Sequence, residues 1–312
     1  MGFYENTDPD RQAPERPTGT LAEDKHTATL AVIAKYSKPV QKGLDNLEIE
    51  YSVNRKTRVC LGLLPEWDPN FPPYNTAKLA SAVKRAGYAC KSFDINVDAY
   101  SRFNDEQWPI EFNPWDSLRD WHWLEDNYYD DIHPHLRPLL DEKLDEIVAF
   151  NPDVIGFTLY YCNEVPTKYM AAELKKRLPT VTIIVGGPST HASFYKGCDL
   201  FDYVVNGEGE QPLLLALENI ENNKSIEYTE NAVSKIIRQP ENQRYNLSTL
   251  PLPDYSDFDF SKYKFPNGAL CEISRGCIAK CTFCEETHFW KYRQRNALST
   301  LDEIEHMYYE HG

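Results

Sequence analysis

Short, mostly apolar runs alternate with helix-like segments from residue 57 to about residue 220. Apolar residues in the intervening segments recur at helical spacing, and the runs themselves are typical of strands buried in a parallel sheet. Because strand–helix–strand crossovers are right-handed, this alternation predicts an α/β fold with a doubly wound parallel sheet of about five strands. The five runs are RVCLGLL, YACKSFDINV, DVIGFTLYY, VTIIVGG and FDYVV. Asn75 or Thr76 can cap the helix expected after the first run.

Changes in composition divide the rest of the chain into further parts. We expect a polar extension rich in Pro and charged residues, a Rossmann-like domain, a Pro- and Asp-rich linker with one short strand, AVSKIIR, and the start of a second domain. The second domain would begin with a strand over 268–274 and end with a helix that Thr300 and Glu303 open as a capping box. The expected boundaries are 1–55, 56–225, 226–266 and 267–312.

An aromatic insertion over 98–135 interrupts the Rossmann-like pattern with four tryptophans. This insertion can form the wall of a pocket, or it can cover one face of the sheet as an amphipathic layer. We favour the second interpretation. His133 and His135 stand two residues apart around a proline in this insertion. Such pairs in polar segments are mostly solvated, so we expect no metal there.

The loops that follow the strands are the candidate ligand site, since open parallel sheets bind ligands beyond the carboxyl ends of their strands. Gly186, Gly187 and Gly207 permit tight turns and let a bulky planar or phosphorylated ligand lie close to the backbone. Glycines at strand-to-helix turns are also ordinary architecture. Glu208 and Glu210, at a helix start, can simply favour the helix dipole.

Three cysteines with ligand spacing carry the strongest chemical signal. Cys277, Cys281 and Cys284 follow one another as C-x3-C-x2-C, whereas Cys60, Cys90, Cys162 and Cys198 stand singly, as free thiols do. Clustered thiolates are suitable ligands for iron or zinc. An iron–sulfur cube bound by three cysteines leaves one iron without a cysteine ligand. A zinc knuckle would recruit Cys271 as fourth ligand. We favour iron because Cys271 reads as a small core residue within the expected strand.

The cysteine loop, with Ser274, Arg275 and Gly276 ahead of it and Phe283 before the last cysteine, resembles the cluster loop of radical S-adenosylmethionine enzymes. With VGGP after one strand, VNGEGE after the next and LPLPDYSDFD in the linker, residues 57–312 resemble the cobalamin-binding subclass. The resemblance implies a Rossmann-like sheet of the cobalamin-binding type. It also implies that the first strand-loop-helix unit of a radical S-adenosylmethionine partial (β/α) barrel follows.

The same resemblance implies three cofactors. Cys277, Cys281 and Cys284 would bind a [4Fe-4S] cluster whose open iron takes S-adenosylmethionine, and Phe283 would contact the adenine unless it only packs in a core. The loop PEWDPNFPPYN contains no histidine, so no lower axial histidine of the D-x-H-x-x-G type is expected. The residues expected around cobalamin are Thr158, Leu159, Tyr160, Gly186, Gly187, Gly207 and Glu208.

The implied reaction is reductive cleavage of S-adenosylmethionine with cobalamin-dependent methyl transfer to an unreactive carbon of a small-molecule or peptide substrate. An electron donor such as flavodoxin or ferredoxin is implied as a partner. No side chain is assigned as catalytic, because the cofactors perform the difficult step. A radical rearrangement or cyclisation enzyme with the same cofactors, and a non-catalytic cobalamin- or metal-binding module, remain alternatives.

Charge and length set further bounds. The net charge of −15, from 33 basic and 48 acidic residues, argues against a nucleic-acid partner. No run reaches the ~18 apolar residues of a membrane span, so we expect a cytoplasmic protein without a membrane partner.

A partial barrel needs several units of about 30 residues each. Since residues 269–312 provide one unit, we expect this chain to be a fragment of the enzyme.

Overall fold

The computed structural model describes the chain from residue 55 onward, with short internal gaps. The expected N-terminal extension lies outside these residues except for Arg55, and Phe283 also lies outside them. The described ranges are 55–106, 108–116, 118, 120–190, 198–230, 235–238, 246–279, 281–282, 284 and 291–311.

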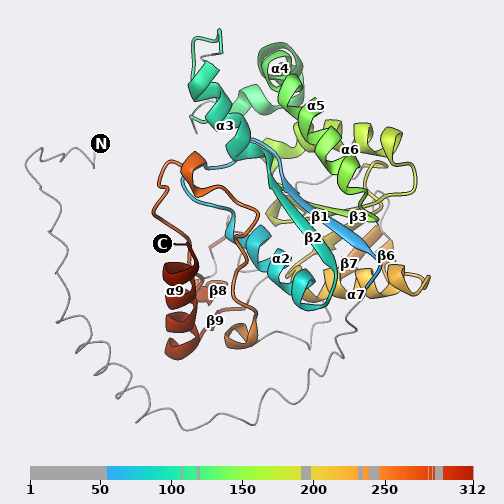
Figure 1. Cartoon of the computed structure of the whole chain (residues 1–312), viewed down its shortest axis with the longest axis vertical. Helices are drawn as coiled ribbons and strands as arrows, with labels where there is room; N and C mark the ends of the chain where they lie inside the picture. The colour runs from blue at the N-terminus through green and yellow to red at the C-terminus, as the bar shows by residue number, and fades with distance from the viewer. Residues whose placement is uncertain are drawn as a thin grey trace, which may run out of the picture. The chain divides into compact units, whose positions relative to one another are not determined.

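A seven-stranded sheet in the order β2-β1-β3-β4-β5-β7-β6 forms the centre of the fold (Figure 1). Neighbouring strands are parallel except for β6, which runs antiparallel to β7. The five predicted strands are all present. The short strand that we expected in the linker instead pairs with β5 as β7. The strands are β1 (Arg58–Leu63), β2 (Ala89–Asp94), β3 (Val154–Thr158), β4 (Thr182–Gly186), β5 (Tyr203–Asn206), β6 (Thr229–Glu230) and β7 (Lys235–Arg238).

Helices cover both faces of the sheet, as the doubly wound pattern predicted (Figure 1). Alternate residues of β1 point to opposite faces: Val59 and Leu61 pack with α2 and α7, and Cys60 packs with α3, α5 and α6. The main helices are α2 (Tyr74–Arg85), α3 (Ile95–Glu106), α5 (His133–Phe150), α6 (Glu164–Arg177) and α7 (Glu210–Glu221). Short helical turns are η1 (Asp120–Trp123), α4 (Glu125–Asn127), η2 (Tyr128–Ile132), η3 (Tyr161–Asn163) and η4 (Pro188–Thr190).

The aromatic insertion covers one face of the sheet, as predicted. Trp108, Trp123 and Tyr128 are buried in the same core as α5 and α6. The Trp123 indole Nε1 donates a 2.7 Å hydrogen bond to the Pro114 carbonyl, so its polar edge is satisfied inside this core. His133 and His135 lie in the first turn of α5, where His135 stacks on the Trp108 ring.

The segment after the sheet packs closely instead of forming an extended linker. Tyr255 and Phe258 form a small core with Ala77 of α2. The Tyr263 hydroxyl donates a 2.6 Å hydrogen bond to Asp94, at the carboxyl end of β2. The segment contains two short helical turns, η5 (Leu247–Thr249) and η6 (Phe260–Lys262).

The strand expected over 268–274 is reduced to β8 (Ser274–Arg275), which pairs antiparallel with β9 (Arg293–Gln294). A strand needs a hydrogen-bonded neighbour along its whole length. Among the described residues of the expected strand, only Ser274 pairs with β9, and the pairing continues to Arg275. The last helix, α9 (Ala297–His311), begins earlier than predicted. Asn296 opens it by accepting a 2.8 Å hydrogen bond from the Ser299 amide, so the predicted capping box is wrong.

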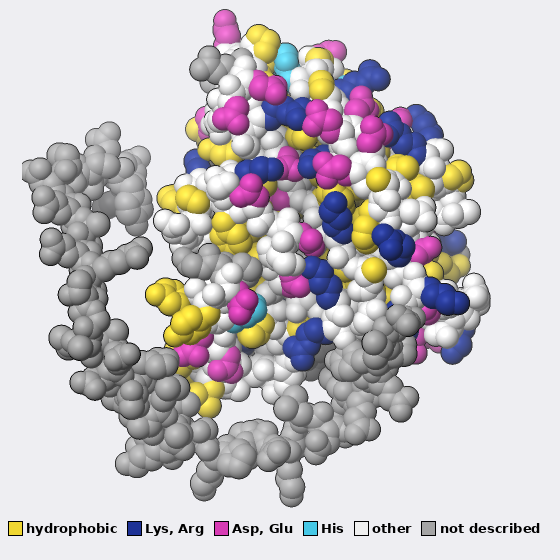
Figure 2. All heavy atoms as spheres, in the orientation of Figure 1, with side chains coloured by type: hydrophobic (Ala, Val, Ile, Leu, Met, Phe, Trp, Pro, Cys, Tyr) yellow, Lys and Arg dark blue, Asp and Glu magenta, His cyan; other side chains and the backbone are white. Residues whose placement is uncertain are grey.

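The outer face of α9 carries exposed apolar side chains. Figure 2 shows hydrophobic side chains together with acidic ones over this helix, and acidic and basic side chains intermingled over the insertion and α5. The exposed apolar residues of α9 are Leu298, Leu301, Ile304, Tyr308 and Tyr309. Within the described ranges, no helix has both the length and the apolar character that a membrane crossing requires.

Candidate cofactor-binding site

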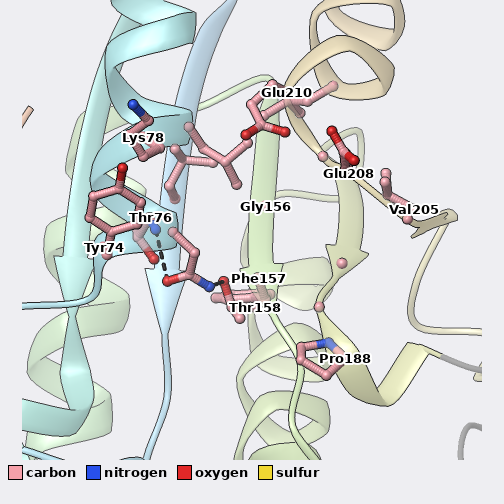
Figure 3. Close-up of a pocket in the computed structure, with 18 of the residues that line it drawn as sticks. Tyr74, Thr76, Lys78, Gly156, Phe157, Thr158, Pro188, Val205, Glu208 and Glu210 are labelled. Atoms are coloured by element: carbon pink, nitrogen blue, oxygen red, sulfur yellow. Dashed lines mark hydrogen bonds between the residues drawn. The ribbon is translucent and has the colours of Figure 1, made fainter. Parts of the chain in front are cut away.

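A cavity of about 540 Å³ opens at the carboxyl ends of β1, β3, β4 and β5, on the face covered by α2 and α7. Its volume lies within the range of about 300 to 1,000 Å³ that is usual for small-molecule sites. One wall is the start of α2, with Tyr74, Thr76 and Lys78, and the facing wall carries Glu208 and Glu210 (Figure 3). The chain order reverses between β1 and β3, so the cavity occupies the position that open parallel sheets use for ligands.

Most of the residues predicted around cobalamin line this one cavity. Leu159 does not, because its side chain is fully buried in the core on the other face. Its backbone instead joins neighbouring loops, donating a 2.7 Å hydrogen bond to the Gly186 carbonyl. The predicted residues that line the cavity are Thr158, Tyr160, Gly186, Gly187, Gly207 and Glu208.

Two of the predicted glycines have backbone conformations that other residues rarely adopt. Gly187 has φ +118°, and a Cβ atom there would lie 2.7 Å from the Leu159 carbonyl oxygen. Gly207 has φ +106°, but a Cβ atom there would meet nothing within 4 Å. Gly187 is therefore required by close packing, whereas Gly207 leaves open space at the cavity wall.

Polar groups of α2 also face the cavity, a position that their sequence context did not indicate. Asn75 accepts a 2.9 Å hydrogen bond from the Thr76 amide and donates a 3.2 Å bond to the Thr158 hydroxyl (Figure 3). The Thr76 hydroxyl is buried without a hydrogen-bond partner. We expected Asn75 or Thr76 to cap α2, but Pro73 occupies the cap position without a side-chain bond. Thr76 thus places a hydroxyl without a protein partner at the cavity wall, whereas the Asn75 amide is already hydrogen-bonded.

The acidic wall of the cavity binds arginines of the cysteine-bearing hairpin, β8–β9. Glu208 Oε2 lies 3.1 Å from Arg275 Nη1, and Glu208 also pairs with Arg293. Glu210 lies 2.9 Å from Arg275 Nη2. Burial alone would lower the Arg275 pKa, but Glu210 and then Glu272 raise it above its usual value, so the guanidinium stays charged. The carboxylates of Glu208 and Glu210 therefore do more than favour the dipole of α7.

The three cysteines lie on a loop that begins at the cavity wall. Gly276 lines the cavity, and Cys277 follows it. Cys277 and Cys281 are exposed, Cys284 is half-buried, and all three are free of disulfides. Across the described residues, no group of three or more metal-binding side chains is already assembled. The structure thus places the thiols on one loop without gathering their sulfurs into a preformed ligand set.

Cys271 lies near Glu303, outside the loop that carries the other three cysteines. Burial and the neighbouring Glu303 carboxylate raise its pKa, which places its thiol beside α9. Cys271 is half-buried and belongs to none of the described hydrophobic clusters, so its interpretation as a small core residue stays a prediction. The four single cysteines are also free thiols, with Cys60 and Cys162 buried and Cys90 and Cys198 half-buried.

Residues 122–217 match the family model of the B12 binding domain. The chain is 30% identical over 184 residues to an uncharacterized methyltransferase of Pyrococcus horikoshii, covering 53% of this chain and 39% of that protein. It is 24% identical over 284 residues to cytidylyl-2-hydroxyethylphosphonate methyltransferase of Streptomyces wedmorensis, covering 77% and 49%. It is 26% identical over 265 residues to anaerobic magnesium-protoporphyrin IX monomethyl ester cyclase of Cereibacter sphaeroides, covering 78% and 36%.

A solved structure shares the fold. The radical S-adenosylmethionine methyltransferase TsrM of Kitasatospora setae, with tryptophan and a S-adenosylmethionine analogue bound, matches with a TM-score of 0.50 and 17% identity. The match covers 81% of this chain and 46% of that one. The chain spans less than half the length of each of these relatives. The chain is thus similar to the B12 binding domain over residues 122–217 and to proteins named methyltransferases and cyclases, which confirms the predicted resemblance to cobalamin-binding radical S-adenosylmethionine proteins.

Proposed function

We propose that this chain is the cobalamin-binding and cluster-bearing part of a radical S-adenosylmethionine enzyme that transfers a methyl group to an unreactive carbon of a small-molecule or peptide substrate. One observation carries the proposal. The cavity at the carboxyl ends of the sheet shares its wall with the start of the cysteine loop, because Gly207 and Gly276 line the same space. Two cofactor sites of the kinds that the family uses would thus be neighbours.

The cavity suits part of a corrinoid. The unpartnered Thr76 hydroxyl offers a hydrogen bond to a polar ligand, and the open space at Gly207 lets a flat group lie against the backbone. A corrin ring with its amide side chains is larger than this cavity. Thr76, Asn75, Thr158 and Gly207 would therefore hold the nucleotide tail.

Beside this cavity, Tyr160 stacks on Trp67, with ring centroids 3.7 Å apart. Trp67 is partly exposed. This aromatic pair follows β1 and β3 at the same end of the sheet, and it offers an apolar surface to a large planar ligand. The pair and the Thr76 pocket together support binding of a cofactor with both a ring and a tail.

The donor set of the cysteine loop suits iron. Cys277, Cys281 and Cys284 would hold a [4Fe-4S] cluster, since thiolates are the usual ligands of such clusters. When bound, the cluster, S-adenosylmethionine and cobalamin supply the electron-transfer, radical and methyl-transfer chemistry. The chain's own residues position these groups. The contact of Phe283 with adenine stays a prediction.

Partners and location are part of the proposal. An electron donor such as flavodoxin or ferredoxin would reduce the cluster, and a cytoplasmic location would keep the exposed thiols of Cys277 and Cys281 reduced. The strongly negative net charge supports a partner other than nucleic acid.

The second candidate is a radical rearrangement or cyclisation with the same cofactors. The relationship to the anaerobic magnesium-protoporphyrin IX monomethyl ester cyclase favours it specifically. A non-catalytic cobalamin- or metal-binding module is the third candidate. Methyl-labelled S-adenosylmethionine separates the first two in the active enzyme, because label in the product requires methyl transfer.

Cofactor binding by the purified chain tests the proposal directly. After anaerobic reconstitution with iron and sulfide, we expect a broad iron–sulfur absorbance band that Cys277→Ala abolishes and the matched control Cys90→Ala retains. Titration with hydroxocobalamin should change its spectrum and quench the tryptophan fluorescence of the chain. Stoichiometric zinc without iron would overturn the cluster assignment. Absence of any spectral change with hydroxocobalamin would overturn the cobalamin assignment.

A further inference from the structure

Glu208 touches both strands of the cysteine-bearing hairpin. Its carboxylate lies 3.1 Å from the Arg275 guanidinium on β8, and it also pairs with Arg293 on β9. The Glu208 side chain is 3% exposed, so these pairs are shielded from water. Charge-assisted bonds from guanidinium groups have a fixed geometry, and the carboxylate therefore sets the position of both strands.

A wider network reinforces this contact. Arg275 is also bound by Glu210 at 2.9 Å and by Glu272 at 2.8 Å. Three carboxylates thus surround two guanidinium groups at the cavity wall. Buried charges of this kind are stable only when each is paired, so loss of one member disturbs the others.

The hairpin positions the cysteine loop directly. Arg275 is separated from Cys277 by Gly276 alone, and the Cys277 backbone forms a bridge with Lys291, two residues before Arg293. Glu208 therefore fixes the segment that enters the loop and the segment that leaves it. Loss of this contact would remove a carboxylate that pairs with both strands, although Arg275 would keep its pair with Glu210.

The same residue is joined to the cofactor cavity. Glu208 follows Gly207, whose backbone lines the cavity with φ +106° and open space beside it. A ligand that rests on Gly207 restrains the backbone from which the Glu208 carboxylate extends. The restraint reaches Arg275 and Arg293 through the ion pairs and then the cysteine loop.

We infer that Glu208 is a positioning residue that couples the two sites, so that a corrinoid in the cavity strengthens cluster binding by the cysteine loop. The inference rests on the proposed function. By thermodynamic linkage, the cluster must strengthen corrinoid binding by the same factor. Coupling between sites is commonly about 5- to 150-fold, and we expect about tenfold here.

The experiment measures the hydroxocobalamin Kd of the full chain, by Trp fluorescence and absorbance, with and without the reconstituted cluster. In wild type, the cluster should tighten binding about tenfold. In Glu208→Gln, which keeps the side-chain size and removes the charge, the two Kd values should be equal. Glu218→Gln on the exposed side of α7 is the matched control and should retain the wild-type ratio.

A purely structural role would lower stability in Glu208→Gln and leave the Kd ratio unchanged, which would overturn the inference. Arg293→Lys, which keeps the charge and loses the guanidinium fork, provides a second test if Glu208→Gln does not fold. It should also lower the ratio toward one. Wild type that binds both cofactors without coupling overturns the inference alone. Wild type that binds neither cofactor overturns the proposed function as well.

Discussion

The Lys78 ammonium on α2 lies 3.3 Å from the Glu303 carboxylate on α9, and both side chains are almost fully buried. Glu303 also accepts a 2.8 Å hydrogen bond from the Tyr74 hydroxyl and pairs with Arg295. Burial lowers the Lys78 pKa, whereas Glu303 raises it in part. This buried network attaches the last helix to the Rossmann-like part of the chain, and its integrity depends on every charge being paired.

Removing Glu303 should destabilise the chain strongly. Glu303→Ala leaves Lys78 and Arg295 as unpaired buried cations, for which a loss of about 3 to 5 kcal/mol in the free energy of unfolding is expected. Urea denaturation followed by circular dichroism measures the change. Glu305→Ala on the exposed face of α9 is the control and should change stability by less than about 0.5 kcal/mol. Equal losses in both variants would contradict a special role of the buried network.

Glu66 should make stability depend on pH. Burial, followed by the charges of Asp120, Asp116 and Asp68, raises its pKa to about 7. The folded chain therefore binds more protons than the unfolded chain between pH ~4.5 and ~7, and the contribution of neutral Glu66 is lost as pH rises through 7.

Glu66→Gln should remove this dependence. Because each pKa unit corresponds to about 1.4 kcal/mol, we expect the variant to gain roughly 1 to 3 kcal/mol over wild type at pH 8 and less at pH 5. Unfolding curves at both pH values provide the measurement, with Glu125→Gln as an exposed control. A gain that is the same at both pH values would show that titration of Glu66 is not its source.

Thr76→Val should separate ligand binding from stability. The Thr76 hydroxyl has no partner and is buried, so an apolar group of the same shape should leave stability unchanged or raise it by up to about 1 kcal/mol. If a corrinoid uses this hydroxyl, the hydroxocobalamin Kd should rise about tenfold, which corresponds to about 1.4 kcal/mol. Thr182→Val, at the opposite end of the sheet, is the control. An unchanged Kd in Thr76→Val would place the ligand elsewhere.

The two left-handed glycines should respond differently to alanine. Gly187→Ala combines an unfavourable φ of +118° with a 2.7 Å contact to Leu159, whereas Gly207→Ala meets only the unfavourable φ of +106°. We expect a loss of about 1 to 2 kcal/mol for Gly207→Ala and a larger loss for Gly187→Ala. Thermal unfolding of both variants checks this order. The reverse order would show that the space beside Gly207 is filled in solution.

The parallel sheet and the cysteine loop could be predicted because their signals are local. Buried strands appear in the sequence as short apolar runs, and cysteines that bind one metal group appear at a characteristic spacing. Glycine loops that follow strands must meet at one edge of a parallel sheet, so Gly187 and Gly207 could be placed together before any coordinates. The pairing of β7 with β5 could not be predicted in this way, because the two strands lie about thirty residues apart in the chain.

The sequence alone therefore determined the fold class, the edge of the sheet at which the cavity opens and the three thiols with ligand spacing. Only the tertiary structure showed that Thr76 faces the cavity instead of capping α2, and that Glu303 joins Lys78 instead of opening α9. It alone paired Glu208 with Arg275, 67 residues later in the chain. Local propensities act over a few residues, whereas a buried ion pair depends on how distant segments pack, because a charge far along the chain finds its partner only in the folded molecule.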